Sequence, residues 1–219
     1  MQLEARSIES LARYGALVLE TNQRFNLTGA KNGAELAAHV IDSLTLLPFV
    51  RTPLVDVGSG AGLPAIPLAI ATATAINVTL VEATRKKARF LACVLQTFGL
   101  QGEVVPLRAE VAAHDERLRE RFASGTARAV ALAPVVLELV LPFLRVGGSA
   151  VLARGRMDAR ERGALEDAAT MLGGFVEAEH RLEDERRIVV VRKTQPTPER
   201  FPRRTGVPEK RPLCLPRDD

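Results

Sequence analysis

Three glycines at alternate positions stand in the segment LVDVGSGAGLPAIPLAI, which spans residues 54–70. An apolar stretch precedes Gly58, Gly60 and Gly62, and a helix-like pattern opens near Pro64. Glycine tolerates unusual backbone dihedrals and lets a ligand approach the bare backbone, while the amides at a helix N-terminus lack helical partners. The segment therefore predicts a strand, a ligand-binding turn and a helix. The alternative is a glycine-rich corner that binds nothing.

The spacing of these glycines distinguishes between nucleotide cofactors. A dinucleotide site has the pattern G-x-G-x-x-G. Here the pattern is G-x-G-x-G, with Leu63 three residues after Gly60 and Asp56 two residues before Gly58. This arrangement is typical of a site for S-adenosyl-L-methionine, which offers a carboxylate, an ammonium and a sulfonium in place of a phosphate. The spacing argues against an NAD-dependent oxidoreductase.

Three charged residues follow or lie in the neighbouring predicted strands. Glu82 ends NVTLVE, the place from which a carboxylate accepts hydrogen bonds from ribose hydroxyls in either kind of nucleoside cofactor. Glu110, in PLRAE, could meet the adenine or could be the acid that favours a helix N-terminus. Arg128, in TARAV, is predicted on the fourth strand, where burial without a partner is costly, so it should reach the crevice or a carboxylate.

The elements that must position these residues alternate along the chain. Strand patterns are predicted at 53–57, 77–82, 103–107, 127–132, 147–153, 174–181 and 186–193. Strands that take turns with helices form parallel sheets, and the last two, joined by a short charged turn, should form an antiparallel hairpin at one edge. The fold class is therefore α/β: a Rossmann-like methyltransferase layout with a mostly parallel sheet, a terminal hairpin and an N-terminal helical extension.

Length and composition indicate one core with extensions. The chain has 219 residues, of which 47% are hydrophobic. We divide it into an N-terminal helical segment packed on the core (1–50), a Rossmann-like core (51–194) and a proline-rich basic tail (195–219). We expect no signal peptide, no membrane span, a cytoplasmic location and a monomer.

Cysteines and histidines do not suggest a metal site. Cys93 and Cys214 are far apart, the first within an apolar helical pattern that predicts burial and the second in the tail, where we expect an exposed thiol. The three histidines are isolated from them. We therefore expect no disulfide and no metal.

The tail combines positive charge with proline. Eight basic residues lie between positions 192 and 217 against two acidic ones: Arg192, Lys193, Arg200, Arg203, Arg204, Lys210, Arg211 and Arg217. Prolines remove amide donors, so we expect no helix here and either a segment lying over the core or a mobile arm. The charge suggests an acidic partner.

Seven stretches in order along the chain resemble one family. They are NLT (26–28), HVIDSLTLLP (39–48), DVGSGAGLPAIPLAI (56–70), LVEATRKKARFL (80–91), RAE (108–110), ARAVA (127–131) and PRRTGVPEKRPLC (202–214). Together they resemble the bacterial small-subunit (16S) ribosomal RNA guanine-N7 methyltransferases, formerly called glucose-inhibited division protein B.

The resemblance implies transfer of a methyl group from S-adenosyl-L-methionine to N7 of one guanine in 16S rRNA, as naked RNA or in the small subunit. By position it implies Gly58 and Leu63 at the first turn, a ribose set, an adenine set and Arg128 near the reacting end. The ribose set is Glu82, Ala83 and Thr84, and the adenine set is Ala109 and Glu110.

Guanine N7 carries a lone pair and no proton, so this reaction needs no general base, and catalysis would rest on orientation. RNA-contact candidates are Asn26, His39, Asp42, Lys86, Arg203 and Arg204. The basic run containing Lys86 could equally be a solvated helix face. The polar patch of His39, Asp42 and Ser43 could face the substrate or hold the N-terminal segment to the core. Phe25 and Tyr14 are candidates for base stacking.

Two other functions remain open. A methyltransferase for a small molecule or another RNA is allowed by the same glycine turn, although the basic tail argues against the first. A noncatalytic RNA-binding protein is disfavoured by the intact set of glycines and Glu82.

Overall fold

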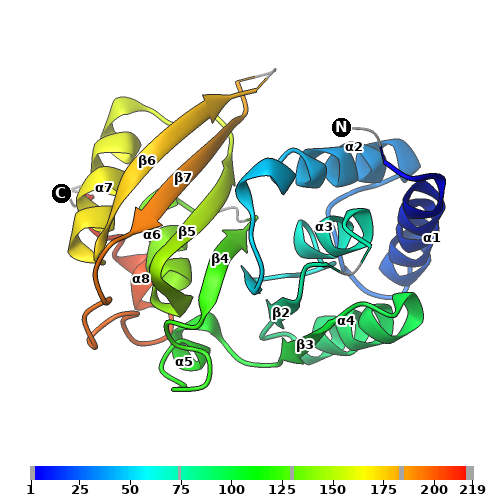
Figure 1. Cartoon of the computed structure of the whole chain (residues 1–219), viewed down its shortest axis with the longest axis horizontal. Coiled ribbons are helices and arrows are strands. Elements are labelled where there is room, and N and C mark those ends of the chain that lie inside the picture. Colours follow the sequence, from blue (N-terminus) through cyan, green and yellow to red (C-terminus); the bar gives the residue numbers. More distant parts are fainter. Residues whose placement is uncertain (1–2, 74, 129–130, 183–184, 216–219) are drawn as a thin grey trace.

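The computed structural model describes residues 3–73, 75–128, 131–182 and 185–215. Within these residues, seven strands form one sheet in the order β3-β2-β1-β4-β5-β7-β6 (Figure 1). The strands are β1 (Leu54–Val57), β2 (Val78–Val81), β3 (Gly102–Val105), β4 (Phe122–Ala127), β5 (Leu144–Arg154), β6 (Gly174–Arg181) and β7 (Arg187–Lys193).

Strands β1 to β5 run in one direction, and β7 is the strand that runs opposite to them. β1 pairs with β2 and β4, and β4 pairs with β5, all in parallel, whereas β7 runs antiparallel between β5 and β6. The predicted terminal hairpin at one edge is therefore confirmed. The carboxyl ends of β1 to β5 and the amino end of β7 share one edge of the sheet, where open α/β sheets bind their ligands.

The predicted position of the fourth strand is wrong. β4 covers Phe122–Ala127, five residues earlier than expected at its start, and all its residues are buried. Arg128 consequently follows the strand instead of lying within it. This placement of Arg128 matters for function, since a residue directly after a parallel strand lies at the ligand-binding edge of the sheet.

Helices cover both faces of the sheet (Figure 1). They are α1 (Ala5–Asn22), α2 (Gly33–Leu44), α3 (Ala65–Ala71), α4 (Arg85–Phe98), α5 (Ala109–Ala112), α6 (Ala133–Val140), α7 (Ala159–Met171) and α8 (Val207–Lys210), with 3-10 turns η1 (Leu47–Phe49) and η2 (Leu141–Phe143). One buried cluster joins the sheet to α5, α6 and α7, and the other joins it to α1, α2, α3 and α4.

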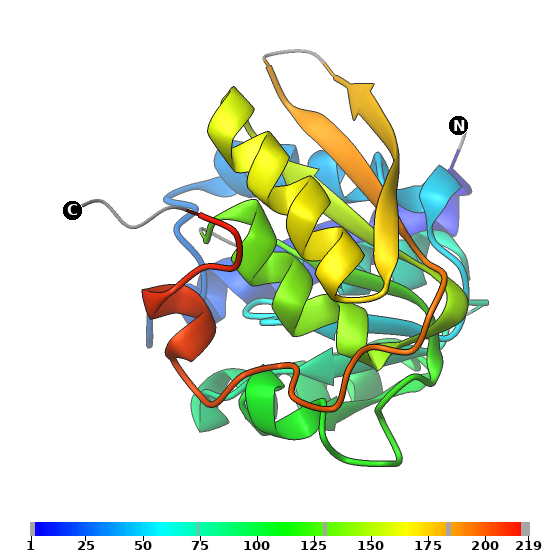
Figure 2. The ribbon, with the colours of Figure 1, turned by 90° about the vertical axis from the view of Figure 1, so that its left-hand side faces the viewer.

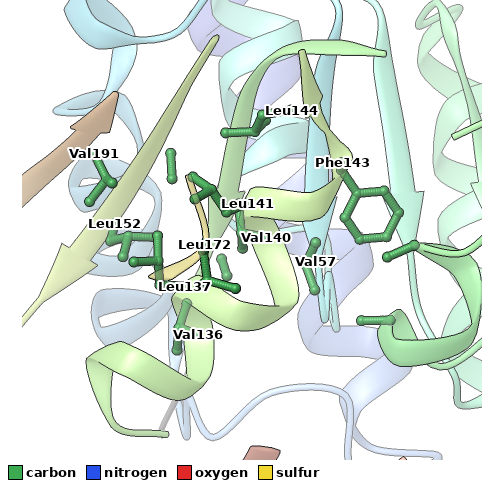
Figure 3. Packing of buried hydrophobic residues seen from close by; sticks show 14 of the residues in the cluster. Val57, Val136, Leu137, Val140, Leu141, Phe143, Leu144, Leu152, Leu172 and Val191 are labelled. Carbon is green, nitrogen blue, oxygen red and sulfur yellow. The ribbon is translucent and has the colours of Figure 1, made fainter. Parts of the chain in front are cut away.

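Alternation along the strands assigns side chains to these two clusters. In β5, Ala150 and Leu152 belong to the cluster around α6, while Val151 between them belongs to the cluster around α3. Successive strand residues point to opposite faces, so an apolar run buried on both faces is what a central parallel strand requires. Figure 3 shows Leu137 and Leu152 of the α6 cluster in this packing.

The N-terminal segment packs on α3. Asn32 caps α2 by accepting a hydrogen bond from the Glu35 amide at 2.9 Å, which fixes where the helix starts. In α1, the Ser7 hydroxyl donates to the Ile70 carbonyl of α3 at 3.3 Å. α1 and α2 thereby cover the helix that follows the glycine turn.

The described part of the tail, residues 195–215, lies over the core. Figure 2 shows it, in orange and red, on the side of the molecule that carries α6 and α7. Phe201 and Leu213 are buried in the α6 cluster, and Arg119 donates to the carbonyls of Phe201 and Thr197 at 2.9 and 2.8 Å. The expectation that the tail contains no helix is wrong, because α8 forms a single helical turn there. It tolerates Pro208 because amides in the first turn have no helical partner.

Two basic residues of the stretch from 192 to 217 lie in β7 and pair with acidic side chains of the chain itself. Lys193 is fully buried and donates to Glu120 at 2.8 Å, and Arg192 pairs with Glu177 at 2.8 Å. The interpretation of this whole stretch as a basic arm is therefore wrong for these positions. Arg217 lies outside the described residues. The expected burial of Cys93 is also wrong, because its position on α4 is exposed, as is Cys214.

Candidate cofactor and substrate site

The glycine turn joins β1 to α3 at the ligand-binding edge. Gly58, Gly60 and Gly62 all have positive φ, at 71°, 56° and 100°. A Cβ on Gly58 would meet no atom within 4 Å, and one on Gly60 would meet only the Gly58 carbonyl oxygen at 3.8 Å. These two glycines border open space.

Gly62 has a different role. A Cβ there would lie 2.4 Å from Cγ1 of Ile66 and 3.1 Å from Cδ2 of Leu91. Gly62 therefore lets α3 and α4 approach the turn, and Leu63 beside it is also buried. Of the predicted glycines, Gly58 and Gly60 border space for a ligand, while Gly62 serves packing.

Glu82 stands directly after β2, beside this turn. One carboxylate oxygen accepts from the Gly60 amide at 2.9 Å, and the other accepts from the Thr84 amide at 2.7 Å. The residue is buried to 7% exposure, while Ala83 and Thr84 are exposed. Two backbone donors hold this carboxylate in one orientation, with lone pairs left for hydroxyl donors.

Asp56, considered from the sequence only as the acid two residues before Gly58, is a further candidate site residue. It is fully buried in β1, and its Oδ1 accepts from the Thr126 hydroxyl at 2.7 Å. No donor in the described part of the chain reaches Oδ2. Burial raises the pKa of this carboxyl to about 6, and the nearby Glu82 adds to the rise. An unpaired buried carboxylate oxygen beside a ligand turn is a place for a cationic donor.

Tyr14 supports the turn from α1. Its hydroxyl donates to the Ala61 carbonyl at 2.9 Å, and the ring is fully buried. Burial raises the pKa of this phenol, so it stays a donor. The prediction of Tyr14 as a base-stacking residue is wrong, and Tyr14 instead holds the N-terminal segment against the glycine turn.

The third strand end carries Ala109 and Glu110 at the start of α5. Ala109 is buried, and the Glu110 carboxylate accepts from the Gly206 amide of the tail at 2.9 Å. Glu110 is thus an acid in the first turn of a helix, as one of the two sequence interpretations had it, and it also ties the tail to this end of the site.

Arg128 binds the polar patch of α2. Its guanidinium donates to the His39 carbonyl at 3.0 Å and to His39 Nδ1 at 2.6 Å, and lies 3.7 Å from Asp42. Burial, and then Arg128, lower the pKa of His39, which suits its role as an acceptor. Arg186 of the hairpin also pairs with Asp42. The patch therefore holds the N-terminal segment to the core.

A cavity of about 220 Å³ opens beside this cluster. Its walls come from α2 and the following turn, from the start of α3, and from the ends of β4, β5 and β7. Asp42 and Arg128 line it, together with Pro64, the residue that precedes α3. The cavity thus reaches the end of the glycine turn at Pro64.

Comparison with known proteins identifies the family. The model of the family described as rRNA small subunit methyltransferase G matches residues 7–190. The chain belongs to this family. The resemblance found in the sequence is therefore confirmed.

Relatives in the rRNA small subunit methyltransferase G family match almost end to end. Proteins named Ribosomal RNA small subunit methyltransferase G from Chloroflexus aggregans and Rubrobacter xylanophilus are each 42% identical to this chain, over 210 and 218 residues. The matches cover 92% and 93% of this chain, and 88% and 83% of the relatives.

Solved structures agree on the fold. An O-methyltransferase from Bacillus cereus, in complex with SAH, has a TM-score of 0.58, with 17% identity, and the match covers 83% of this chain and 91% of that one. At that identity the likeness shows the Rossmann-like methyltransferase fold alone. None of the helices in the described part of this family member has the length and apolar character of a membrane span.

The remaining candidates for RNA contact do not lie together in this member of the family. Asn26, Lys86 and Arg204 are exposed. Arg203 instead donates to Glu138 through its backbone amide at 2.8 Å and through its guanidinium, from Nη2 to Oε2 at 2.6 Å. Glu138 is fully buried in α6. We therefore assign Arg203 a structural role.

Proposed function

We propose that this chain transfers a methyl group from S-adenosyl-L-methionine to N7 of a guanine in 16S ribosomal RNA. The observation that carries the proposal is the open turn at Gly58 and Gly60, with the fixed carboxylate of Glu82, next to a cavity lined by Asp42 and arginines. Membership of the rRNA small subunit methyltransferase G family supports the substrate class.

The residues at the turn fit the cofactor. Gly58 and Gly60 leave space that any side chain would fill, Glu82 presents lone pairs for ribose hydroxyls, and the free Oδ2 of Asp56 suits the cofactor's ammonium. Ala83, Thr84, Ala109 and Glu110 remain candidates for the nucleoside end. When bound, S-adenosyl-L-methionine supplies a methyl group on a positively charged sulfur.

The chemistry of the cavity favours N7 over other guanine atoms. N7 has a lone pair and no proton, whereas the exocyclic amine must lose a proton when it is methylated. The titratable groups that line the cavity are Asp42 and arginines, and an arginine does not act as a base at neutral pH. The carboxylate of Asp42 is engaged by Arg186. Orientation of N7 toward the methyl group, worth up to roughly 7–11 kcal/mol in favourable cases, would then carry the catalysis.

An extruded guanine is the form of the substrate that this site could reach. N7 lies in the deep, narrow major groove of an A-form helix, which side chains cannot read. Enzymes that act on a base take it out of the stack. Exposed Asn26, Lys86 and Arg204 are proposed contacts to the RNA. We expect the chain to act as a monomer and, given this substrate, in the cytoplasm.

The decisive experiment supplies methyl-labelled S-adenosyl-L-methionine to the purified protein with small-subunit particles that lack this modification. We expect label at one guanine, detected by nucleoside mass spectrometry and by strand scission specific for N7-methylguanine. If the protein binds the cofactor but labels no RNA, the acceptor is a different molecule and the proposal fails.

Replacing Glu82 with alanine should weaken cofactor binding. The change removes a charged acceptor for hydroxyl groups, which contributes about 1.5–3 kcal/mol. Calorimetric titration with S-adenosyl-L-methionine measures the loss. Glu103→Ala is the control, since that carboxylate lies on β3 and touches Thr79 instead of the turn. Equal affinities of the Glu82 variant and the wild type would remove Glu82 from the ribose site.

Cofactor affinity should fall in mild acid because of Asp56. The folded chain without cofactor takes up a proton at Asp56 as pH falls through about 6, well above the usual range of this carboxyl. A protonated Asp56 no longer attracts the ammonium, so affinity should drop by up to about tenfold per pH unit below 6. Titrations between pH 5 and 7 test this. Asp56→Asn should flatten the profile, and an equally steep profile in that variant would exclude Asp56 as the cause.

A further inference from the structure

Two arginines in the wall of the 220 Å³ cavity carry unused donors. Arg154 donates through its terminal nitrogens to the Ala131 carbonyl and to Glu161, both at 2.7 Å, and Arg187 donates to Glu179 at 2.7 Å. The Nε–H of each is buried, and no acceptor in the described part of the chain reaches it. The side chains are 11% and 9% exposed. Buried donors without acceptors are rare and suit an acceptor on a ligand.

Asp42, on α2, provides a hydrogen-bond acceptor in the same cavity as these donors. Among the described residues that line the cavity, it carries the carboxylate, and its Oδ2 has only the 3.7 Å contact with Arg128. The hydroxyls of Ser43 and Thr45, which also line the cavity, donate to carbonyls of their own helix. A carboxylate has about four lone-pair positions, so Asp42 can accept from a ligand while Arg186 holds it.

The size and the remaining walls of the cavity suit one flat base. Its volume is about 220 Å³, below the roughly 300–1,000 Å³ of pockets for drug-sized ligands, so a whole cofactor does not fit. Pro64, Leu182 and Ile188 supply apolar surface.

We infer that this cavity receives the target guanine and that Asp42 recognises its Watson–Crick edge. This inference rests on the proposed function and names the residues that would read the base. Guanine presents two adjacent donor groups, N1–H and the N2 amine, which a carboxylate can accept together, and an O6 acceptor for an arginine. Adenine and cytosine present a ring nitrogen acceptor beside their amine, and uracil flanks its single donor with two carbonyls. Reading this edge leaves N7, on a different edge, free to meet the methyl group.

The test compares two bases in two proteins. Small-subunit particles are reconstituted with guanine or with hypoxanthine, which lacks the N2 amine, at the position that the wild-type protein methylates. With wild type, hypoxanthine should lower kcat/KM about tenfold or more, since a charged hydrogen bond is lost. With Asp42→Asn, kcat/KM on guanine should fall at least tenfold, and the change to hypoxanthine should then cost less than twofold.

Asp115→Asn is the matched control. Asp115 has the same side-chain exposure as Asp42, 26%, and also pairs with an arginine, Arg117, but it does not line the cavity. This variant should behave as wild type on both particles.

The outcomes separate the inference from the proposed function. A purely structural role of Asp42 would lower the rates on both bases by the same factor, and that result would overturn the inference while leaving methylation intact. It would also leave the cavity as a site for another part of the RNA. If the wild-type protein labels neither particle, the proposed function fails and the inference falls with it.

Discussion

Replacing Arg203 with alanine is expected to lower the free energy of unfolding by about 3–5 kcal/mol. The reason is the fully buried carboxylate of Glu138, which accepts from the Arg203 guanidinium at 2.9 and 2.6 Å and from its backbone amide at 2.8 Å. Removing one partner of a buried pair leaves an uncompensated charge. Urea titration monitored by circular dichroism measures the change.

Arg204→Ala is the control for this prediction. Arg204 is the neighbouring residue in the tail and has the same charge, but it is exposed. A surface substitution of this kind changes stability by less than about 0.5 kcal/mol. If both variants unfold at the same urea concentration as the wild type, the ion pair of Arg203 does not hold the tail, and its guanidinium becomes available to RNA again.

The second large effect is expected at Gly62. A methyl group there would lie 2.4 Å from Cγ1 of Ile66, and the backbone φ of 100° is unfavourable for alanine. The left-handed conformation costs about 1–2 kcal/mol and overpacking about 1–3 kcal/mol. Gly62→Ala should therefore lose about 2–5 kcal/mol of stability.

Gly58→Ala is the comparison that separates packing from binding. Its φ of 71° carries the backbone cost, but its methyl group would enter open space. We expect a loss of only about 1–2 kcal/mol of stability, together with weakened cofactor binding. Thermal unfolding and calorimetry on both variants provide the two readouts. Equal losses of stability in the two variants would show that Ile66 moves away from the added methyl group without a cost in free energy.

The sequence predicted the glycine turn between β1 and α3 because its signal is local. Positive φ at Gly58 and Gly60 follows from residue type, and Glu82 follows from the end of an apolar strand. The fourth strand was misplaced because its sequence, FASGTA, consists mainly of small residues and contains only Phe122 and Thr126 of the types that mark strands. Gly125 within it is required by packing, since a Cβ there would lie 2.6 Å from Val140 of α6.

The partners of charged residues could not be predicted, because they are distant in sequence. Arg203 and Lys193 resembled parts of a basic arm, yet their acidic partners, Glu138 and Glu120, lie 65 and 73 residues earlier. One indication of a partner for Glu138 was present in the sequence, since this charged residue lies inside an otherwise apolar run. Asp42 and Arg186 are 144 residues apart, so the lining of the cavity also emerges only from the fold.

The docked tail has a consequence for how the protein is made. During synthesis, Glu138 is added to the chain 65 residues before its partner Arg203. Until Arg203 has been added, burial of the Glu138 carboxylate on α6 is costly because no cation compensates its charge. Phe201 and Leu213, which complete the same core cluster, also arrive after the last strand. The native packing on the α6 face of the sheet is therefore complete only after every strand and these residues of the tail have been synthesised.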